Sequence, residues 1–155
     1  MTIRSLSGLV LIIITLLTAC KKEENVPLPE NLMRLTNGSY KDWRLEKVTY
    51  ILFNVVDQIP DCQRDEIYRF YSDGNGEVHS GPNPCPPADP DNPTPEPEVQ
   101  ATGSWTFVGQ GEEIHINWQD KMDWEARVDE LTDSKLVVTG IVFDNYRVTA
   151  TFRPL

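Results

Sequence analysis

Histidine and cysteine are scarce in this chain, and their scarcity limits the chemistry that it can perform. Two histidines and three cysteines occur among 155 residues. His79 and His115 stand far apart and lack the spacing of zinc ligands or of a nucleophilic site. The seven serines include no Gly-x-Ser-x-Gly element of a hydrolase. We therefore expect no catalytic residue, no metal site and no cofactor, and we do not expect an enzyme.

An apolar run long enough to cross a bilayer as a helix, which takes about 20 residues, is also missing. A shorter run from Leu6 to Leu17 follows Arg4, which is the layout of a secretory signal peptide. It ends in Leu17-Thr18-Ala19-Cys20, which resembles the lipobox of bacterial lipoproteins. The resemblance implies that residues 1–19 are removed and that Cys20 becomes the lipid attachment site. An ordinary signal peptide beside a chance cysteine is the alternative.

Residues 20–34 are expected to be the lipidated cysteine and a flexible tether. Lysine directly after the cysteine resembles the pattern of lipoproteins that are sent to the outer membrane. The run Lys21-Lys22-Glu23-Glu24 resembles a short tag for cell-surface display, although a solvated spacer explains it equally well. The stretch ENLMRLTNG, residues 30–38, predicts one or two helical turns ended by Gly38.

Basic residues are outnumbered in the part of the chain that follows the signal. Residues 20–155 hold 24 acidic residues against 13 basic ones, because Arg4 lies in the signal, and their net charge is −11. Such a domain is repelled by nucleic acid and by anionic lipid headgroups. We therefore expect no nucleic-acid partner, and a membrane partner only through the lipid on Cys20.

Two cysteines remain once Cys20 is assigned to the lipid. Cys62 and Cys85 form an even pair in a chain that is exported to an oxidising compartment, which favours a disulfide. Two free thiols or a metal site are the alternatives, and the metal site lacks nearby partners.

From Tyr40 onward the pattern predicts β-strands, with a bulge between Leu45 and Val48 where the apolar parity shifts. Residues 81–98 contain eight prolines and predict an exposed, acidic loop. The expected strands are 43–56, 65–72, 75–80, 100–108, 112–118, 122–130, 135–143 and 145–153. The pattern therefore predicts an all-β domain over residues 35–155, with about eight antiparallel strands that close into an up-and-down barrel.

The order of these features resembles the lipocalin-like domain of small bacterial outer-membrane lipoproteins. The segments that carry the resemblance are the lipobox, KDWRLEKV, DCQRDEIYRFYSDG, Cys85, GSWTF and ELTDSKLVVTG. They cover most of residues 35–155, but the proline-rich insertion after Cys85 departs from the pattern. The resemblance implies a barrel or half-barrel and brings no known ligand with it.

Carboxylates give weak signals for chemistry. Asp73, Asn75 and Glu77 have part of the spacing of a calcium loop, but Val78 occupies the position that needs glycine, so a plain hairpin turn is favoured. Asp61, Asp65 and Glu66 flank a cysteine in a turn, where solvated carboxylates are ordinary, and catalysis there is a remote alternative.

Aromatic side chains are the strongest candidates for binding, because eight of them are expected to face one interior. They are Trp43, Phe70, Trp105, Phe107, Trp118, Trp124, Tyr146 and Phe152. A barrel of eight strands has an interior just wide enough for side chains, so a filled interior with at most a shallow cavity is favoured. For a ligand at the mouth, the candidate residues are Trp43, Trp118 and Trp124, with Trp43 and Trp118 near a rim and Trp105 in the core.

These patterns predict a non-catalytic, lipid-anchored envelope lipoprotein. We expect it to bind a small apolar or ring-containing ligand, or to act as an accessory binding protein of the outer membrane. The alternative is a structural or interaction module that contacts another envelope protein through the proline-rich acidic loop.

Overall fold

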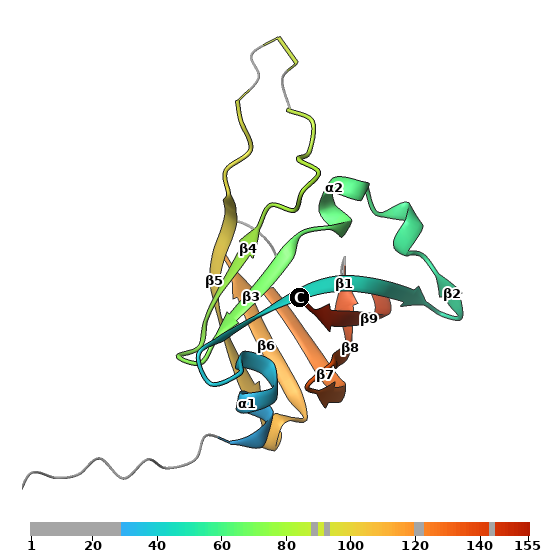
Figure 1. Ribbon diagram of the computed structural model, residues 1–155. Coiled ribbons are helices and arrows are strands. Elements are labelled where there is room, and N and C mark those ends of the chain that lie inside the picture. Colours follow the sequence, from blue (N-terminus) through green and yellow to red (C-terminus); the bar gives the residue numbers. More distant parts are fainter. Residues whose placement is uncertain (1–28, 88–89, 92–93, 120–122, 143–144) are drawn as a thin grey trace, which may run out of the picture.

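Eight antiparallel strands follow one another around a closed barrel (Figure 1). The computed structural model describes residues 29–87, 90–91, 94–119, 123–142 and 145–155. The barrel strands are β1 (Tyr40–Tyr50), β3 (Ile67–Tyr71), β4 (Asn75–His79), β5 (Val99–Val108), β6 (Glu113–Trp118), β7 (Asp123–Thr132), β8 (Lys135–Val142) and β9 (Tyr146–Pro154). Consecutive barrel strands pair antiparallel, and β9 returns to pair with β1. The up-and-down barrel predicted from the sequence is therefore confirmed.

The first predicted strand, 43–56, is divided in the structure. β1 ends at Tyr50, and a two-residue turn leads into the short strand β2 (Phe53–Asn54), which pairs back onto the end of β1. A 3-10 turn, η1 (Val56–Gln58), follows. The predicted bulge is present, because the register between β1 and β9 shifts between Leu45 and Lys47. The apolar pattern of the segment is continuous across the turn, which is why it predicted one long strand.

The turn after β1 holds a β-branched residue in the left-handed region. Ile51 has a φ of 59°, a conformation that costs an L-residue about 1–2 kcal/mol and that asparagine adopts more readily. We expect Ile51→Asn to raise the free energy of unfolding by about 1 kcal/mol, which urea denaturation would measure. The control is Leu52→Asn beside it, which relieves no left-handed backbone. Equal effects of the two changes would contradict the prediction.

A short helix closes one end of the barrel. α1 (Glu30–Thr36) begins after Pro29 and ends at Asn37, which is left-handed and donates its N–H to the Met33 carbonyl at 2.7 Å. The predicted helical turns are thus present. Leu35 is fully buried, and its carbonyl accepts a hydrogen bond of 2.9 Å from Trp43 Nε1. Arg34 Nη1 donates to the Leu131 carbonyl at 3.0 Å, so the helix is joined to both β1 and β7.

Aromatic side chains fill the interior, and five of the eight expected there are buried: Trp43, Phe70, Trp105, Trp118 and Phe152. Phe107 and Trp124 are partly buried against this core, whereas Tyr146 is 50% exposed, contrary to the expectation. Phe70 lies between Trp105 and Trp118, with ring centroids 5.9 and 6.2 Å apart. Gly76 and Gly103 pair across β4 and β5, and a Cβ at either would come within 2.9 Å of the Trp118 ring. Gly76 is held to glycine by the indole, and Gly103 also by the backbone carbonyl of Asn117, 2.2 Å from where its Cβ would lie. The packing agrees with the favoured expectation of a filled interior.

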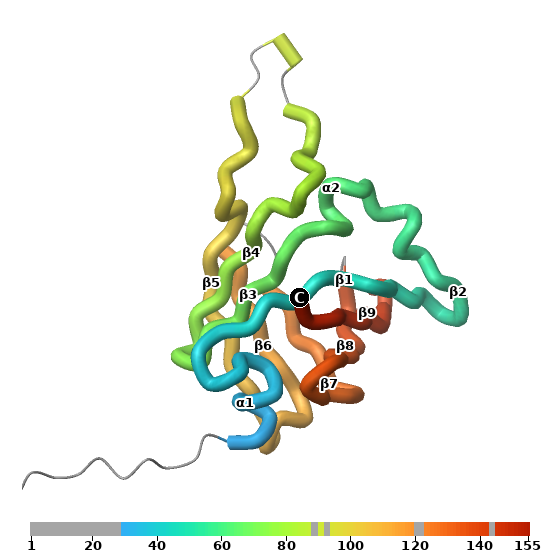
Figure 2. Tube along the Cα trace, viewed as in Figure 1, coloured from blue at the N-terminus to red at the C-terminus, as the bar shows by residue number. Residues whose placement is uncertain are grey.

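The opposite end of the barrel carries α2 (Asp61–Arg64) and the proline-rich loop. A disulfide joins Cys62 to Cys85 with 4.9 Å between the Cα atoms, which confirms the predicted pair. The Asn83 N–H and Nδ2 both donate to Asp65, at 2.9 and 2.7 Å, and the Cys85 N–H donates to Glu96 at 2.8 Å. The described parts of the loop rise from the barrel beside each other (Figure 2). The base of the loop is therefore fixed covalently and by hydrogen bonds.

Candidate functional site

Three depressions on the barrel surface adjoin one another around Ser104-Trp105-Thr106: two lie over the strands, and one lies beside α1 at the end that the helix closes. The polar depression has a volume of 530 Å³, lies over β3 to β6 and includes Tyr71, Asp73, Asn75, Glu77, Thr102 and Gln119. The α1 groove has a volume of 710 Å³ and runs between the start of α1, the β3–β4 turn and the end of β5. The third depression, of 280 Å³, lies over β5 to β7. Asp73 belongs to both of the larger depressions.

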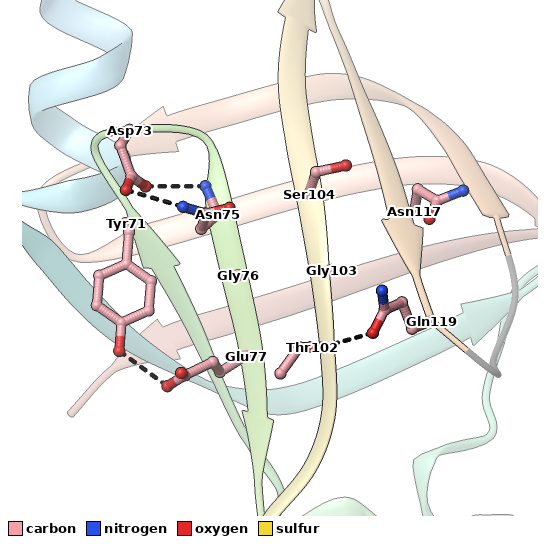
Figure 3. A pocket seen from close by; sticks show the side chains of 10 residues that line it. All are labelled: Tyr71, Asp73, Asn75, Gly76, Glu77, Thr102, Gly103, Ser104, Asn117 and Gln119. Atoms are coloured by element: carbon pink, nitrogen blue, oxygen red, sulfur yellow. Dashed lines mark hydrogen bonds between the residues drawn. The ribbon is translucent and has the colours of Figure 1, made fainter.

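The side chains of the polar depression bond to one another (Figure 3). Tyr71 Oη donates to Glu77 Oε2 at 2.8 Å, and Asn75 donates to Asp73 from its N–H at 3.0 Å and from its Nδ2 at 2.8 Å. Within the described residues, no group of three histidine, cysteine, aspartate or glutamate side chains is placed to hold a metal ion. The Asp73–Asn75 bonds shape a hairpin turn. The same hydroxyl, amide and carboxylate groups are able to hydrogen-bond a ligand that carries hydroxyl groups.

Glu77 is the carboxylate of this depression that bonds two different side chains, those of Tyr71 and His79. The hydrogen bond from Tyr71 lowers the pKa of Glu77, with a smaller contribution from His79, whose Nε2 lies 2.8 Å from the same carboxylate. A carboxyl group with a lowered pKa in the folded state stabilises the protein above its unfolded pKa. That stability is lost as the pH falls through the folded pKa.

We expect Tyr71→Phe to move the pKa of Glu77 back toward the ordinary value of a glutamate, because the strongest donor to the charged carboxylate is removed. NMR titration of the Glu77 side-chain carbonyl would measure this change. Thr102→Val, in the same depression but bonded to Gln119, is the control. An unchanged Glu77 titration in Tyr71→Phe would show that the hydrogen bond does not hold the charge.

The α1 groove is lined by aromatic rings in fixed positions. Trp105 Nε1 donates to the carbonyls of Tyr71 and Asn75 at 3.2 and 2.9 Å, which fixes the indole plane. The Phe107 ring meets it edge-on, with centroids 5.4 Å apart. Leu32 of α1 lies across from them in the same groove and packs against the core. The groove thus offers rings and an aliphatic wall to a ligand with an apolar ring.

One wall of the α1 groove has unusual backbone geometry. η2 (Gly109–Gly111) holds three successive residues at positive φ, namely 60°, 62° and 92° for Gly109, Gln110 and Gly111. The Gln110 carbonyl accepts a hydrogen bond of 3.3 Å from Asn31 Nδ2 on α1. A Cβ at Gly111 would lie 2.1 Å from that Nδ2 and would displace the Asn31 side chain, and the φ of 92° itself favours glycine at this position. Glycine adopts such φ values freely, so Gln110 is the one residue of the three that a side chain disfavours in this conformation.

The tryptophans predicted as ligand residues do not gather around one cavity. Trp43 was expected near a rim, and it is fully buried because α1 covers it. Trp118 is buried against Gly76 and Gly103 and contacts Phe70 in the same core cluster. Trp124 is half-buried on β7, and its Nε1 is buried without a hydrogen-bond partner in the described part of the chain. Trp105 lies in the core, as expected, and its edge reaches the α1 groove.

The other candidate residues have structural surroundings. Asp61 pairs with Arg64, Asp65 bonds Asn83, and Glu66 accepts a hydrogen bond of 3.2 Å from Tyr68 Oη. Cys20, the predicted lipid attachment site, lies outside the described residues. Among the described residues, no helix is both long enough and apolar enough to span a bilayer.

The sequence did not predict that α1 and η2 form two walls of a groove beside Trp105. The signal that was present is the pair of glycines around Gln110, directly after an aromatic strand. Neither the comparison with protein-family models nor that with curated proteins finds a match for this chain.

Proposed function

We propose that this protein is a non-catalytic, lipid-anchored binding protein of the bacterial cell envelope, with a lipocalin-like barrel. The closed eight-stranded barrel is consistent with a lipocalin-like fold, and the Leu17-Thr18-Ala19-Cys20 motif supports anchoring. The observation that carries the binding role is the α1 groove, where Trp105, Phe107 and Leu32 border one depression.

The ligand is a ring-containing molecule with a hydroxylated part. The filled interior leaves the surface depressions as the place for binding, and the α1 groove at the end of the barrel supplies apolar contacts. The polar depression begins at Asp73, where the groove ends, and its hydroxyl, amide and carboxylate groups suit sugar-like hydroxyls. Aromatic glycosides combine both features, whereas fatty acids lack the ring.

A fluorescence titration tests the binding role, because a ring that stacks near Trp105 changes the indole emission. Aromatic glycosides, sterols and fatty acids are added in turn to the wild-type protein. Phe107→Ala is expected to weaken binding about tenfold, since burying such a ring contributes about 1.5–3 kcal/mol. The matched control is Val108→Ala, the next residue, which is exposed and outside the groove. No emission change with any compound would remove the support for a ligand.

The anchoring part of the proposal has its own test. Cys20→Ala should abolish metabolic labelling with palmitate and leave an uncut precursor. Protease added to intact cells distinguishes surface display from the periplasmic face, with the four residues Lys21–Glu24 replaced by alanine as the comparison. A processed, lipid-labelled form of Cys20→Ala would contradict the anchoring.

A second candidate function is contact with another envelope protein through the proline-rich loop. The observation that favours it is the base of the loop, which is held by the Cys62–Cys85 disulfide and by the bond from Cys85 to Glu96. A fixed base presents an extended segment to a partner at a low entropic cost. A photo-crosslinking residue at Thr94 should give a discrete product in intact cells, and one at the exposed Lys47 should not.

A further inference from the structure

The turn between β1 and β2 exposes three large apolar side chains in succession. Ile51 is 69% exposed, Leu52 87% and Phe53 70%. We call these three residues the apolar tip. Figure 1 shows the tip projecting sideways from the barrel, away from both α1 and the proline-rich loop. The flanking segment from Tyr50 to Val56 carries no charged residue.

The fold itself does not require apolar residues here. The position of Ile51 has a φ of 59°, which glycine or asparagine adopts at lower cost in a tight hairpin turn. Leu52 contributes almost nothing to the core, since most of its surface faces solvent. The sequence thus places exposed, strained and apolar residues where turn residues would be more stable. Such a departure from local preference is typical of a functional surface.

The shape of the tip favours a bilayer over a protein partner. A stable protein interface takes about 800 Å² and 20–30 residues from each side, whereas the tip is a convex knob of three residues. The lipid interface accepts a convex apolar group without a complementary pocket. Tyr50 and Tyr146 lie directly behind the tip with ring centroids 5.5 Å apart, and tyrosine is enriched at the level of the lipid headgroups.

The chain before the domain also places a membrane within reach. The first helix begins at Glu30, and nine residues separate it from Cys20. Nine residues can span at most about 30 Å, so a lipid on Cys20 would keep the start of the domain within that distance of the membrane surface. A second, weak apolar contact then acts at a high effective concentration. Given a net charge of −11 after residue 19, the lipids that suit the tip are zwitterionic.

We propose that Ile51, Leu52 and Phe53 insert into the interfacial region of the membrane that holds the lipid anchor and fix the orientation of the barrel on it. This inference rests on the proposed anchoring through Cys20. In this orientation the β1–β2 turn faces the bilayer. The tip therefore sets which part of the outer wall a soluble ligand can approach.

The test uses the lipidated full-length mature protein in vesicles of phosphatidylcholine and phosphatidylethanolamine, with and without brominated acyl chains. Bromine quenches an indole that enters the bilayer. Phe53→Trp should gain emission that is blue-shifted and is lost with brominated lipid, after subtraction of the wild-type signal. Val108→Trp, exposed at the end of the barrel nearer α1, should show no such loss. Adding Leu52→Asp to Phe53→Trp should keep the tip out of the bilayer, so that brominated lipid no longer quenches the new indole.

Each other outcome overturns the proposal and identifies what failed. If the protein floats with the vesicles but the indole of Phe53→Trp stays unquenched, the tip does not insert and the anchoring stands. If the protein does not float, the anchoring fails and this proposal fails with it. If the new indole is shielded without quenching and the shielding depends on protein concentration, the tip binds protein.

Discussion

Replacing Trp43 by alanine is expected to lower the free energy of unfolding by about 3–5 kcal/mol, the range for a large-to-small change in a core. Trp43 is fully buried, and its Nε1 donates a hydrogen bond to the carbonyl of Leu35 on α1. The change therefore leaves a cavity and also removes a bond between the helix and the barrel. Urea denaturation, followed by far-ultraviolet circular dichroism, would measure the loss.

Trp43→Phe separates the two contributions, because it keeps an aromatic ring and removes only the donor and part of the volume. We expect it to cost about 1–3 kcal/mol, which is the range for leaving a buried polar group without its partner. The fluorescence change on adding ligand should stay normal in Trp43→Phe under conditions where the variant is folded. If Trp43→Phe had normal stability but lost its ligand response, Trp43 would contact the ligand, and a purely structural role for it would be wrong.

The strands could be predicted because apolar and polar residues alternate along most of them. In β6, Ile114, Ile116 and Trp118 are buried while His115 and Asn117 face outward, as the period of two requires. The closure of the barrel followed from the number of strands and their short connections. The break after Tyr50 could not be predicted, because Ile51 and Leu52 are not turn residues and continue the apolar pattern.

The candidate site was only partly predictable, for a different reason. Alternation shows which side chains point inward, but it does not show which end of a barrel a helix will cover. α1 covers Trp43 and so removes it from any rim. In the α1 groove, Asn31 donates a hydrogen bond to the carbonyl of Gln110, which lies 79 residues away in sequence. No local sequence pattern predicts such a contact. Gly111 lies beside this contact, and its φ of 92° favours glycine, but only the structure shows that it adjoins Asn31.

Loss of the Cys62–Cys85 disulfide is expected to lower the free energy of unfolding by about 3 kcal/mol, since a crosslink of this span restricts the unfolded chain. The bridge joins positions 23 apart in sequence and connects α2 to the start of the proline-rich loop. The double change of Cys62→Ser with Cys85→Ser should unfold at lower urea and show no response to reductant. The wild-type protein should lose a similar amount of stability when reductant is added, and its mass should rise by two hydrogens.

The structure also predicts where the loss of the disulfide is felt. The bonds from Asn83 to Asp65 and from Cys85 to Glu96 hold the base of the loop beside α2, next to the disulfide. Amide hydrogens of Asn83 and Cys85 should therefore exchange faster in the double variant, while those of β6 and β7 keep their relative protection. The α1 groove lies at the opposite end of the barrel, so ligand response should survive below the unfolding transition. Uniformly faster exchange, with no larger change at the loop, would mean that the bridge acts only on the unfolded chain and that hydrogen bonds alone organise the loop.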